Sequence, residues 1–465
     1  MNSISFSNLA LHPEILNNLE TLGYQEMTPV QARSLPLILK NHDIIVKAKT
    51  GSGKTAAFGL GILSKVDLQH FKPQALVICP TRELADQVGK EIRRLGRLIP
   101  NLRVLTLCGG KPLRMQAESL RHGPHILVAT PGRLQDHIEK RTLDLKHIRT
   151  LVLDEADRMV DMGFFDTIVD IIKVLPSKRQ TLLFSATYPT TIAELCQFIQ
   201  TNPIEVTLDT QDNSADILQF AYQVSEKEKN EVLFALFKHY SMQSTIIFCN
   251  TKKQCDEVAM YLCDNGLYAL PIHSDLEQRE REEILLQFAN NSCPVLVATD
   301  VAARGIDIKD LPFVINYDLP SSPEIYVHRI GRTGRIGKSG IAISLFGDAQ
   351  NFKLETIEKY IQSVVTRETK ESLNTTKNVA MVPLMRTLCI NGGKKNKMRP
   401  TDILGALTGE GGLTANQVGK IDIFDFHSYV AINHIVSSQA LHKLQQGKIK
   451  GRTFKVRYLD NFDSE

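Results

Sequence analysis

Short apolar runs rich in β-branched residues alternate with amphipathic stretches along most of the 465-residue chain, and this alternation limits the possible folds more than any other feature. The runs at 75–79 (ALVIC) and 150–154 (TLVLD) are continuously apolar, which is typical of strands covered on both faces of a parallel sheet. The stretch 83–99 has the periodicity of an amphipathic helix. The alternation stops in the polar segment 209–216 and resumes at 245–249 (TIIFC). The sequence therefore predicts two successive α/β domains, each with a parallel sheet.

A third unit of different topology follows the polar segment 366–378. Its elements read β-α-β-β-α-β, which is the order of a ferredoxin-like or RRM-like α+β module. The expected strands are 386–392, 420–424, 428–432 and 453–459, and the expected helices begin at Pro400 and cover 437–446. We therefore expect domains at 1–208, 217–365 and 383–462.

Composition excludes several other classes of protein. No apolar run approaches the length of a membrane span, about 18 residues, and the N-terminus lacks a basic segment followed by an apolar core. The eight cysteines form no CxxC pair, and several lie within apolar strand-like runs, so we interpret them as core residues in a reducing compartment. We therefore expect a cytoplasmic protein without a membrane segment, a disulfide frame or a structural metal.

The segment 48–55 (AKTGSGKT) follows an apolar strand and precedes a helical stretch, which is the setting of a P-loop. Glycines at 51 and 53 would let backbone N–H groups face phosphate oxygens. Lys54 would reach the β- and γ-phosphates, and the Thr55 hydroxyl would bind Mg²⁺. An ordinary glycine-rich turn is the alternative, and the flanking strand and helix argue against it. The predicted ATP-binding residues of this loop are Ala48 (in place of the usual glycine), Lys49, Thr50, Gly51, Ser52, Gly53, Lys54 and Thr55.

Two further groups of charged residues fit the same site. Asp154 ends an apolar strand, where it would hold Mg²⁺ directly or through water, and Glu155 would orient or deprotonate the attacking water. The second domain has no complete P-loop pattern (GxxxxGK[ST]) of its own, but it carries arginines at 329, 332 and 335 within HRIGRTGR. We interpret them as arginine fingers that neutralise the γ-phosphoryl group when the two domains close; a solvated basic helix start is the alternative.

These residues belong to an ordered set of motifs through which the chain resembles the DEAD-box RNA helicases over roughly residues 1–365. The resemblance implies two RecA-like domains, an ATP-dependent RNA helicase activity and the cofactors ATP and Mg²⁺. The motifs are GYQEMTPVQ (23–31), AKTGSGKT (48–55), PTRELA (80–85), GG (109–110), TPGR (130–133), DEAD (154–157), SAT (185–187), IIFCNT (246–251), ATDVAARGID (298–307) and HRIGRTGR (328–335).

The resemblance also implies roles for individual residues. Gln31 would read the adenine edge while Phe6 stacks on the base, and Asp307 would approach the nucleotide from the second domain. Arg332 and Arg335 would contact the γ-phosphate. The residues implied to couple hydrolysis to domain closure are Asp157, Ser185, Thr187 and His328.

For RNA, nearly all of the matching positions carry hydroxyls, amides, cationic side chains or glycine backbone, which suit phosphate and 2′-OH contacts and do not read base sequence. We therefore expect the core to bind RNA without sequence preference. In the first domain these positions are Thr81, Arg82, Gly109, Gly110, Thr130 and Arg133; in the second they are Asn250, Thr251, Gln278, Arg281, Thr299 and Asp300.

The third unit accounts for the net positive charge of the chain. The formal charge of +4 divides into +5 for residues 386–465 and −1 for the rest, which favours an RNA-targeting role for this unit. Cys389 occupies a position that is usually aromatic in RRM domains, and only Tyr429, with His427 as a substitute, fits the other stacking positions. We therefore do not expect a base-stacking platform on its sheet. The expected RNA contacts are Lys394, Lys395, Lys397, Arg399, Lys450 and Arg452.

The segment 392–432 resembles the C-terminal domain of the DbpA subfamily. That resemblance implies binding to a hairpin of 23S ribosomal RNA on pre-50S particles and a role in assembly of the large ribosomal subunit. We expect a monomeric, RNA-dependent ATPase that separates short duplexes without processive travel. An ATP-gated RNA clamp and a DNA helicase are the alternatives; the complete set of hydrolytic residues argues against the first, and the DEAD tetrad with Gln31 argues against the second.

Overall fold

The computed structural model describes residues 5–48, 51–207, 217–303, 311–334, 340–374, 383–409 and 412–459. They fall into two compact units, of which the first contains the described residues up to 207 and the second those from 217 onward. Each unit is built around a seven-stranded sheet, and the second also contains a four-stranded sheet. The prediction of two tandem parallel α/β domains followed by a small α+β module is confirmed.

The sheet of the first unit is entirely parallel and has the order β3-β4-β2-β5-β6-β1-β7. Its strands are β1 (Ile44–Lys47), β2 (Ala75–Ile78), β3 (Val104–Leu107), β4 (Ile126–Ala129), β5 (Thr150–Asp154), β6 (Gln180–Ser185) and β7 (Ile204–Thr207). Its helices are η1 (Phe6–Asn8), α1 (Pro13–Thr21), α2 (Pro29–Leu39), α3 (Lys54–Leu63), α4 (Arg82–Leu95), α5 (Leu113–Leu120), α6 (Pro131–Glu139), α7 (Ala156–Asp161), α8 (Phe165–Lys173) and α9 (Thr190–Ile199).

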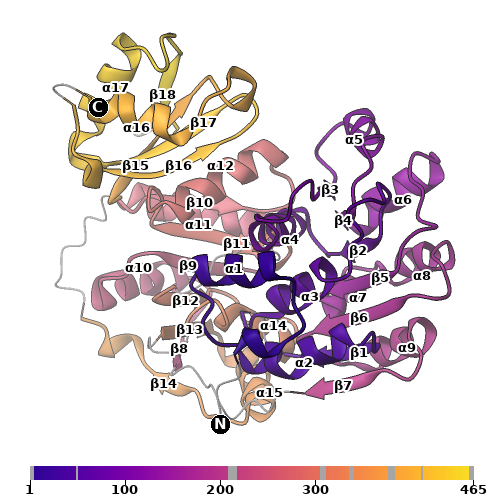
Figure 1. Ribbon diagram of the computed structural model, residues 1–465. Coiled ribbons are helices and arrows are strands. Elements are labelled where there is room, and N and C mark those ends of the chain that lie inside the picture. Colours follow the sequence, from indigo (N-terminus) through magenta and orange to yellow (C-terminus); the bar gives the residue numbers. More distant parts are fainter. Residues whose placement is uncertain are drawn as a thin grey trace. The chain divides into compact units, whose positions relative to one another are not determined.

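The apolar runs are continuous because helices cover both faces of this sheet (Figure 1). Along β2, Ala75 and Val77 join the core cluster formed with α1–α4, whereas Leu76 and Ile78 join the cluster formed with α6–α9. Alternate side chains of one strand therefore need apolar partners on opposite faces.

The large sheet of the second unit is also parallel, with the order β10-β11-β9-β12-β13-β8-β14. Its strands are β8 (Ile217–Gln223), β9 (Thr245–Cys249), β10 (Ala269–Ile272), β11 (Val295–Thr299), β12 (Phe313–Asn316), β13 (Gly340–Phe346) and β14 (Thr366–Glu368). Its helices are α10 (Lys229–Tyr240), α11 (Lys252–Asp264), α12 (Gln278–Ala289), α13 (Asp300–Ala303), α14 (Pro323–Ile330), η3 (Asp348–Gln350), α15 (Asn351–Ile361) and η4 (Lys370–Ser372).

The polar segment 366–378, which we expected to separate the third unit from the second domain, belongs in part to the second domain. Thr366–Glu368 forms β14 and pairs with β8, and Leu373 is buried in the core of this sheet, so the sheet extends beyond the expected boundary at 365. The segment was difficult to recognise because β14 lies at the edge of the sheet, where polar side chains are tolerated.

The small sheet is antiparallel, in the order β16-β17-β15-β18, and confirms the expected β-α-β-β-α-β sequence. One of its faces packs on two helices through a core that includes Leu388, Ile403, Val430 and Leu444. The opposite face meets α12 of the neighbouring domain (Figure 1). The elements are β15 (Met385–Ile390), η5 (Lys394–Asn396), α16 (Pro400–Thr408), η6 (Ala415–Gln417), β16 (Val418–Ile423), β17 (Ser428–Asn433), η7 (His434–Val436), α17 (Ser437–Gln446) and β18 (Val456–Tyr458).

Candidate functional site

The loop between β1 and α3 has the backbone geometry of a phosphate-binding turn. Gly53 has φ +94°, and a Cβ atom there would lie 2.6 Å from Gln31 Nε2, so only glycine fits. The Lys54 ammonium is buried and donates to the Ala48 carbonyl 2.9 Å away, across the loop. The N-terminus of α3 and the Lys54 ammonium therefore lie at the same loop, and this arrangement suits an anionic ligand. Lys49 and Thr50 lie outside the described residues.

Gln31 joins this loop to the start of α2 through the two ends of its amide. Its Oε1 accepts from Thr28 N (2.9 Å) and its Nε2 donates to Gly53 O (3.2 Å), while Thr28 Oγ1 donates to Ser52 O (2.8 Å). Phe6 is only 3% exposed and meets the ring of Tyr24 edge-on, with centroids 6.1 Å apart. The predicted contacts of Gln31 and Phe6 with adenine stay predictions.

The two acidic residues at the end of β5 differ in environment. Burial, with a smaller contribution from Glu155, raises the pKa of Asp154 to about 7, although the nearby Lys54 acts in the opposite direction. Glu155 has the left-handed φ of +54° and forms an ion pair with Arg158. Asp154 Oδ1 is buried and has no hydrogen-bond partner among the described residues. A carboxylate oxygen left unpaired near Lys54 of the loop fits the oxygen-ligand chemistry of Mg²⁺.

Asp157 joins the ends of β5 and β6. Its Oδ2 accepts from Ala186 N (3.2 Å), Thr187 N (2.8 Å) and Thr187 Oγ1 (2.8 Å). Ser185 Oγ accepts from Asp157 N (3.3 Å) and donates to Thr187 O (2.6 Å). The structure therefore brings together three of the four predicted coupling residues; the fourth, His328, lies on α14 of the other unit.

The predicted RNA residues of the first unit occupy the other half of the same sheet edge. Thr81, Gly109 and Thr130 follow β2, β3 and β4, which are neighbours in the sheet. Thr81 Oγ1 caps α4 by accepting from Leu84 N (3.2 Å). A Cβ on Gly109 would lie 2.6 Å from the Arg82 guanidinium, so this glycine gives that side chain its room. Gly110 follows with φ +83°.

Arg133 is held by a network that sequence reasoning missed. Its Nη1 donates to Lys111 O (2.8 Å) and to Gln116 Oε1 (3.1 Å), and its Nε pairs with Asp136 (3.1 Å). Gln116 Oε1 also contacts His137 Nε2 (3.1 Å), and burial lowers the pKa of that histidine. Nothing in the spacing of Gln116 and Arg133, on different helices, indicates this contact.

In the second unit, Arg329 organises the edge of the sheet. Its guanidinium makes two bonds to the Asp300 carboxylate (2.6 and 2.7 Å) and one to Asn250 Oδ1 (3.1 Å). It also donates to Asn316 Oδ1 (3.2 Å) and to a backbone carbonyl, and it is 2% exposed. The interpretation of Arg329 as a finger is therefore wrong, because all of its donors face inside this domain.

The other predicted residues of the second unit lie at the ends of its strands and helices. Thr251 caps α11 by accepting from Gln254 N (3.2 Å), and Thr299 ends β11. Gln278 begins α12, with Arg281 one turn later. Arg332 follows α14, and its carbonyl accepts from Leu311 N (3.1 Å). Asp307 and Arg335 lie outside the described residues.

The two basic segments of the small domain are brought together. Lys450 Nζ donates to Lys397 O (3.0 Å), which joins the segment 394–399 to the segment 448–452. Backbone bonds from Lys394 N to Phe424 O (2.8 Å) and from Lys395 N to Asp425 O (3.0 Å) fix the first segment to the β16–β17 turn. All six predicted RNA contacts of this domain are solvent-exposed: Lys394, Lys395, Lys397, Arg399, Lys450 and Arg452.

The sheet face that usually binds RNA in RRM domains instead contacts protein. Cys389 and Tyr429 are buried against Leu286 of α12, and the Tyr429 hydroxyl donates to Glu283 Oε1 (2.9 Å). A second bond joins Asn290 Nδ2 to Thr387 Oγ1 (2.8 Å). The expectation that these positions form no stacking platform is confirmed, and we call this contact between α12 and the small sheet the α12 seam.

Comparison with known proteins agrees with this arrangement. Three family models match in succession: "DEAD/DEAH box helicase" at residues 28–195, "Helicase conserved C-terminal domain" at 227–337 and "DbpA RNA binding domain" at 387–458. The ATP-dependent RNA helicase DbpA of Escherichia coli is 51% identical over 98% of this chain and 99% of its own length. The chain belongs to the DbpA family of DEAD-box RNA helicases.

Other relatives share the two large domains of this helicase. The DEAD-box ATP-dependent RNA helicase CshA of Geobacillus kaustophilus is 43% identical over 76% of this chain and 76% of its own. The structure of Saccharomyces cerevisiae Dbp5 bound to RNA and ADP BeF3 has a TM-score of 0.71 and 33% identity, covering 79% of this chain and 96% of that one. This helicase is thus an ATP-dependent enzyme that acts on RNA. No helix among the described residues is long and apolar enough to cross a membrane.

Proposed function

We propose that this helicase separates short RNA duplexes locally and that its small domain directs it to a hairpin of 23S ribosomal RNA on pre-50S particles during assembly of the large ribosomal subunit. One observation carries the targeting part. Two basic segments from opposite ends of the small domain meet through Lys397 and Lys450, and they lie on a domain attached to the motor by the α12 seam. The length of the match to the Escherichia coli relative supports the same proposal.

ATP hydrolysis would use the residues at the ends of β1 and β5. Lys54 would bind the β- and γ-phosphates, and Thr55 and Asp154 would hold Mg²⁺, which when bound neutralises phosphate charge. Glu155 would orient the attacking water or accept its proton. Arg332 and Arg335 would neutralise charge that develops on the γ-phosphoryl group.

RNA would cross the ends of β2, β3 and β4 in the first unit and the ends of β9 and β11 with the start of α12 in the second. The hydroxyls of Thr81, Thr251 and Thr299 would contact phosphate or 2′-OH groups. Because Asp300 is already engaged by Arg329, we propose that it acts through the position of that arginine. The enzyme would work as a cytoplasmic monomer.

The decisive experiment measures ATPase stimulation by a panel of ribosomal RNA fragments. A fragment that contains the 23S hairpin should stimulate turnover far more than other RNA; equal stimulation by every RNA would contradict the targeting proposal. Glu155→Gln should still bind ATP and RNA but lose turnover, and turnover that survives would contradict its role.

A variant that keeps the α12 seam is better suited to test targeting than removal of the domain. Ending the chain after Val382 should leave basal activity and abolish fragment preference, but it would also expose Leu286 on α12. The triple change Lys394→Ala, Lys395→Ala and Lys450→Ala removes exposed charge and leaves the α12 seam intact. Its preference for the 23S fragment should fall while stimulation by unstructured RNA persists.

Two assays separate this proposal from its alternatives. Strand displacement of a short RNA duplex distinguishes a helicase from an ATP-gated clamp, because a clamp would hydrolyse ATP without displacing the strand. ATPase stimulation by RNA and DNA of the same sequence distinguishes an RNA from a DNA helicase.

A further inference from the structure

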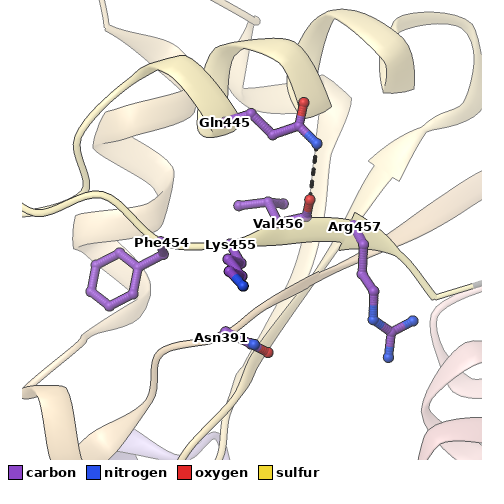
Figure 2. A pocket seen from close by; sticks show the side chains of 6 residues that line it. All are labelled: Asn391, Gln445, Phe454, Lys455, Val456 and Arg457. Atoms are coloured by element: carbon purple, nitrogen blue, oxygen red, sulfur yellow. Dashed lines mark hydrogen bonds between the residues drawn. The ribbon is translucent and has the colours of Figure 1, made fainter.

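A pocket lies at the edge of the small sheet, and its lining residues have no role in the functions proposed above. It has a volume of about 480 Å³ and is lined by Asn391, Gln445, Phe454, Lys455, Val456 and Arg457 (Figure 2). Pockets for small organic ligands have volumes of about 300–1,000 Å³, so this one has room for a nucleotide.

Strand pairing brings the polar side chains of the pocket to one face. Cys389 of β15 lies opposite Arg457 of β18, and two pairs along, just beyond the strands, Asn391 N donates to Lys455 O (2.9 Å). Because side chains alternate along a strand, Lys455 and Arg457 share a face, and Val456 turns into the core. An amide and two cations therefore border the pocket from neighbouring strands.

Phe454 adds an aromatic ring. The ring is half-buried, because it packs against the core cluster of Val456 and on Gly392, where a Cβ atom would lie 2.5 Å from ring Cε1; the rest of the ring lines the pocket. Figure 2 shows the ring beside Lys455, while the Gln445 amide is directed to the Val456 carbonyl (3.0 Å). An aromatic ring next to cations is the combination with which proteins hold single-stranded nucleic acid: the base stacks and the cations bind phosphate.

Within the described part of the chain, the two cations of the pocket have no carboxylate partner. Both Lys455 and Arg457 are exposed. The one side-chain bond of Arg457 runs from Nη1 to its neighbour's carbonyl, Tyr458 O (3.0 Å). Two uncompensated cations beside an aromatic ring favour an anionic ligand with a planar group over an acidic peptide.

The pocket lies next to both the basic segments and the α12 seam of this domain. Going along the chain, Arg452 belongs to the basic segments, Phe454 and Lys455 to the pocket, and Arg457 reaches the row of Cys389 and Tyr429 that forms the α12 seam. The pocket therefore lies between the proposed binding surface for folded RNA and the motor domain.

We propose that this pocket binds one unpaired nucleotide of the RNA strand that adjoins the folded element held by the basic segments. Phe454 stacks on the base, Asn391 contacts its edge, and Lys455 and Arg457 bind the phosphates. This site rests on the proposed function, because it extends the contact of the small domain from a folded hairpin to its single-stranded flank.

Binding of two RNA probes to the full chain tests the site: a 23S stem-loop alone and the same stem-loop with a short single-stranded extension. Lys455→Ala with Arg457→Ala should weaken binding of the extended probe about tenfold and lower its salt dependence by a slope of about one to two, while the bare stem-loop changes less than about twofold. Phe454→Leu should weaken binding of the extended probe about fivefold without a change in salt dependence. The matched control is Lys353→Ala with Lys359→Ala on α15, which removes the same charge elsewhere and should bind both probes like wild type.

Two further measurements locate the ligand. A 4-thiouridine in the extension should crosslink to the peptide that contains Phe454. Equal losses for both probes, a pocket variant that binds like the control, or crosslinks elsewhere would overturn the assignment. Inhibition by AMP as effective as by the extension would assign the pocket to a free nucleotide and also overturn it.

The triple variant Lys394→Ala, Lys395→Ala and Lys450→Ala keeps the two proposals apart. If it binds the bare stem-loop normally, the proposed targeting surface is wrong. The crosslink, and the difference between the two probes in the Lys455→Ala with Arg457→Ala variant, would still show whether the pocket binds the single-stranded extension.

Discussion

The carboxylate of Asp157 accepts hydrogen bonds that fix the residues after β6. Replacing the carboxylate by an amide shows how much these bonds stabilise that segment. Donors from its own helix and from the residues after β6 converge on it: Arg158 N on Oδ1 (3.0 Å), and Ala186 N, Thr187 N and Thr187 Oγ1 on Oδ2. In Asp157→Asn only one oxygen remains. In the less costly orientation it keeps the three donors on Oδ2 but loses the bond to Arg158.

The cost follows from the loss of charge. A hydrogen bond to a charged acceptor contributes about 1.5–3 kcal/mol and a neutral one about 1 kcal/mol, so three weakened bonds destabilise the segment by about 2 kcal/mol. That is about thirtyfold in the equilibrium for local opening. Thr187→Val removes a single bond to the charged carboxylate, about 1.5 kcal/mol at the lower end of that range, and should change the same equilibrium about tenfold.

Amide hydrogen exchange of the full chain measures this opening equilibrium directly, because the Ala186 and Thr187 amides are themselves donors to Asp157. Both amides should exchange about thirtyfold faster in Asp157→Asn. The control Asp170→Asn changes an exposed carboxylate paired with Lys173 and should leave them unaltered. Unchanged exchange in Asp157→Asn would refute the reasoning. If the restraint transmits hydrolysis, strand displacement per ATP should fall in the same variant.

Three more perturbations follow from the geometry. Gly53→Ala places a Cβ 2.6 Å from Gln31 Nε2 at φ +94°, and binding of a fluorescent ATP analogue should weaken at least about tenfold. Burial lowers the pKa of His137 in the folded protein, so as the pH falls this histidine is protonated first in the unfolded chain. The free energy of unfolding should therefore fall between about pH 7.5 and pH 5.5. Heat denaturation at several pH values should show a smaller fall in His137→Gln. Arg329→Lys loses the two-point contact with Asp300 and should destabilise the second unit by about 3–5 kcal/mol in chemical denaturation.

Each of these changes has a matched control. Gly132→Ala introduces a methyl group with nothing within 4 Å and should bind ATP like wild type. His434→Gln alters a histidine on the exposed side of η7 and should keep the acid response of wild type. Arg367→Lys alters a surface ion pair with Glu358 and should cost at most about 1 kcal/mol. Equal effects in a variant and its control would show that the named contact is not the cause.

The two sheets and the phosphate-binding half of the site could be predicted because their signals are local. Continuous apolar runs identify strands covered on both faces, and the spacing of 48–55 specifies a turn between a strand and a helix. Edge strands such as β7 and β14 lack that signal, since one of their sides meets no further strand.

Arg329 shows a signal that was present but overlooked. Tyr326, Arg329 and Ile330 are spaced three and four residues apart and share the buried face of α14, so the first arginine of HRIGRTGR belongs to the interior. The contacts of Gln116 with Arg133 and His137 had no comparable signal, because they join two helices through the fold alone. The α12 seam also depends on three-dimensional contact: Glu283, Leu286 and Asn290 look like ordinary residues of a surface helix until the small sheet covers them.

The α12 seam fixes a distance between two proposed RNA contacts of the protein. A single helix of 12 residues, about 18 Å long, begins with the predicted RNA contact Gln278 and carries the small sheet through Glu283 and Leu286. If RNA binds at both places as proposed, the length of α12 would set how many nucleotides separate the RNA element at the small domain from the strand at the start of α12. The enzyme would then choose its duplex by its distance from a fixed mark on the RNA, and lengthening the intervening RNA should move the place of melting by the same number of nucleotides.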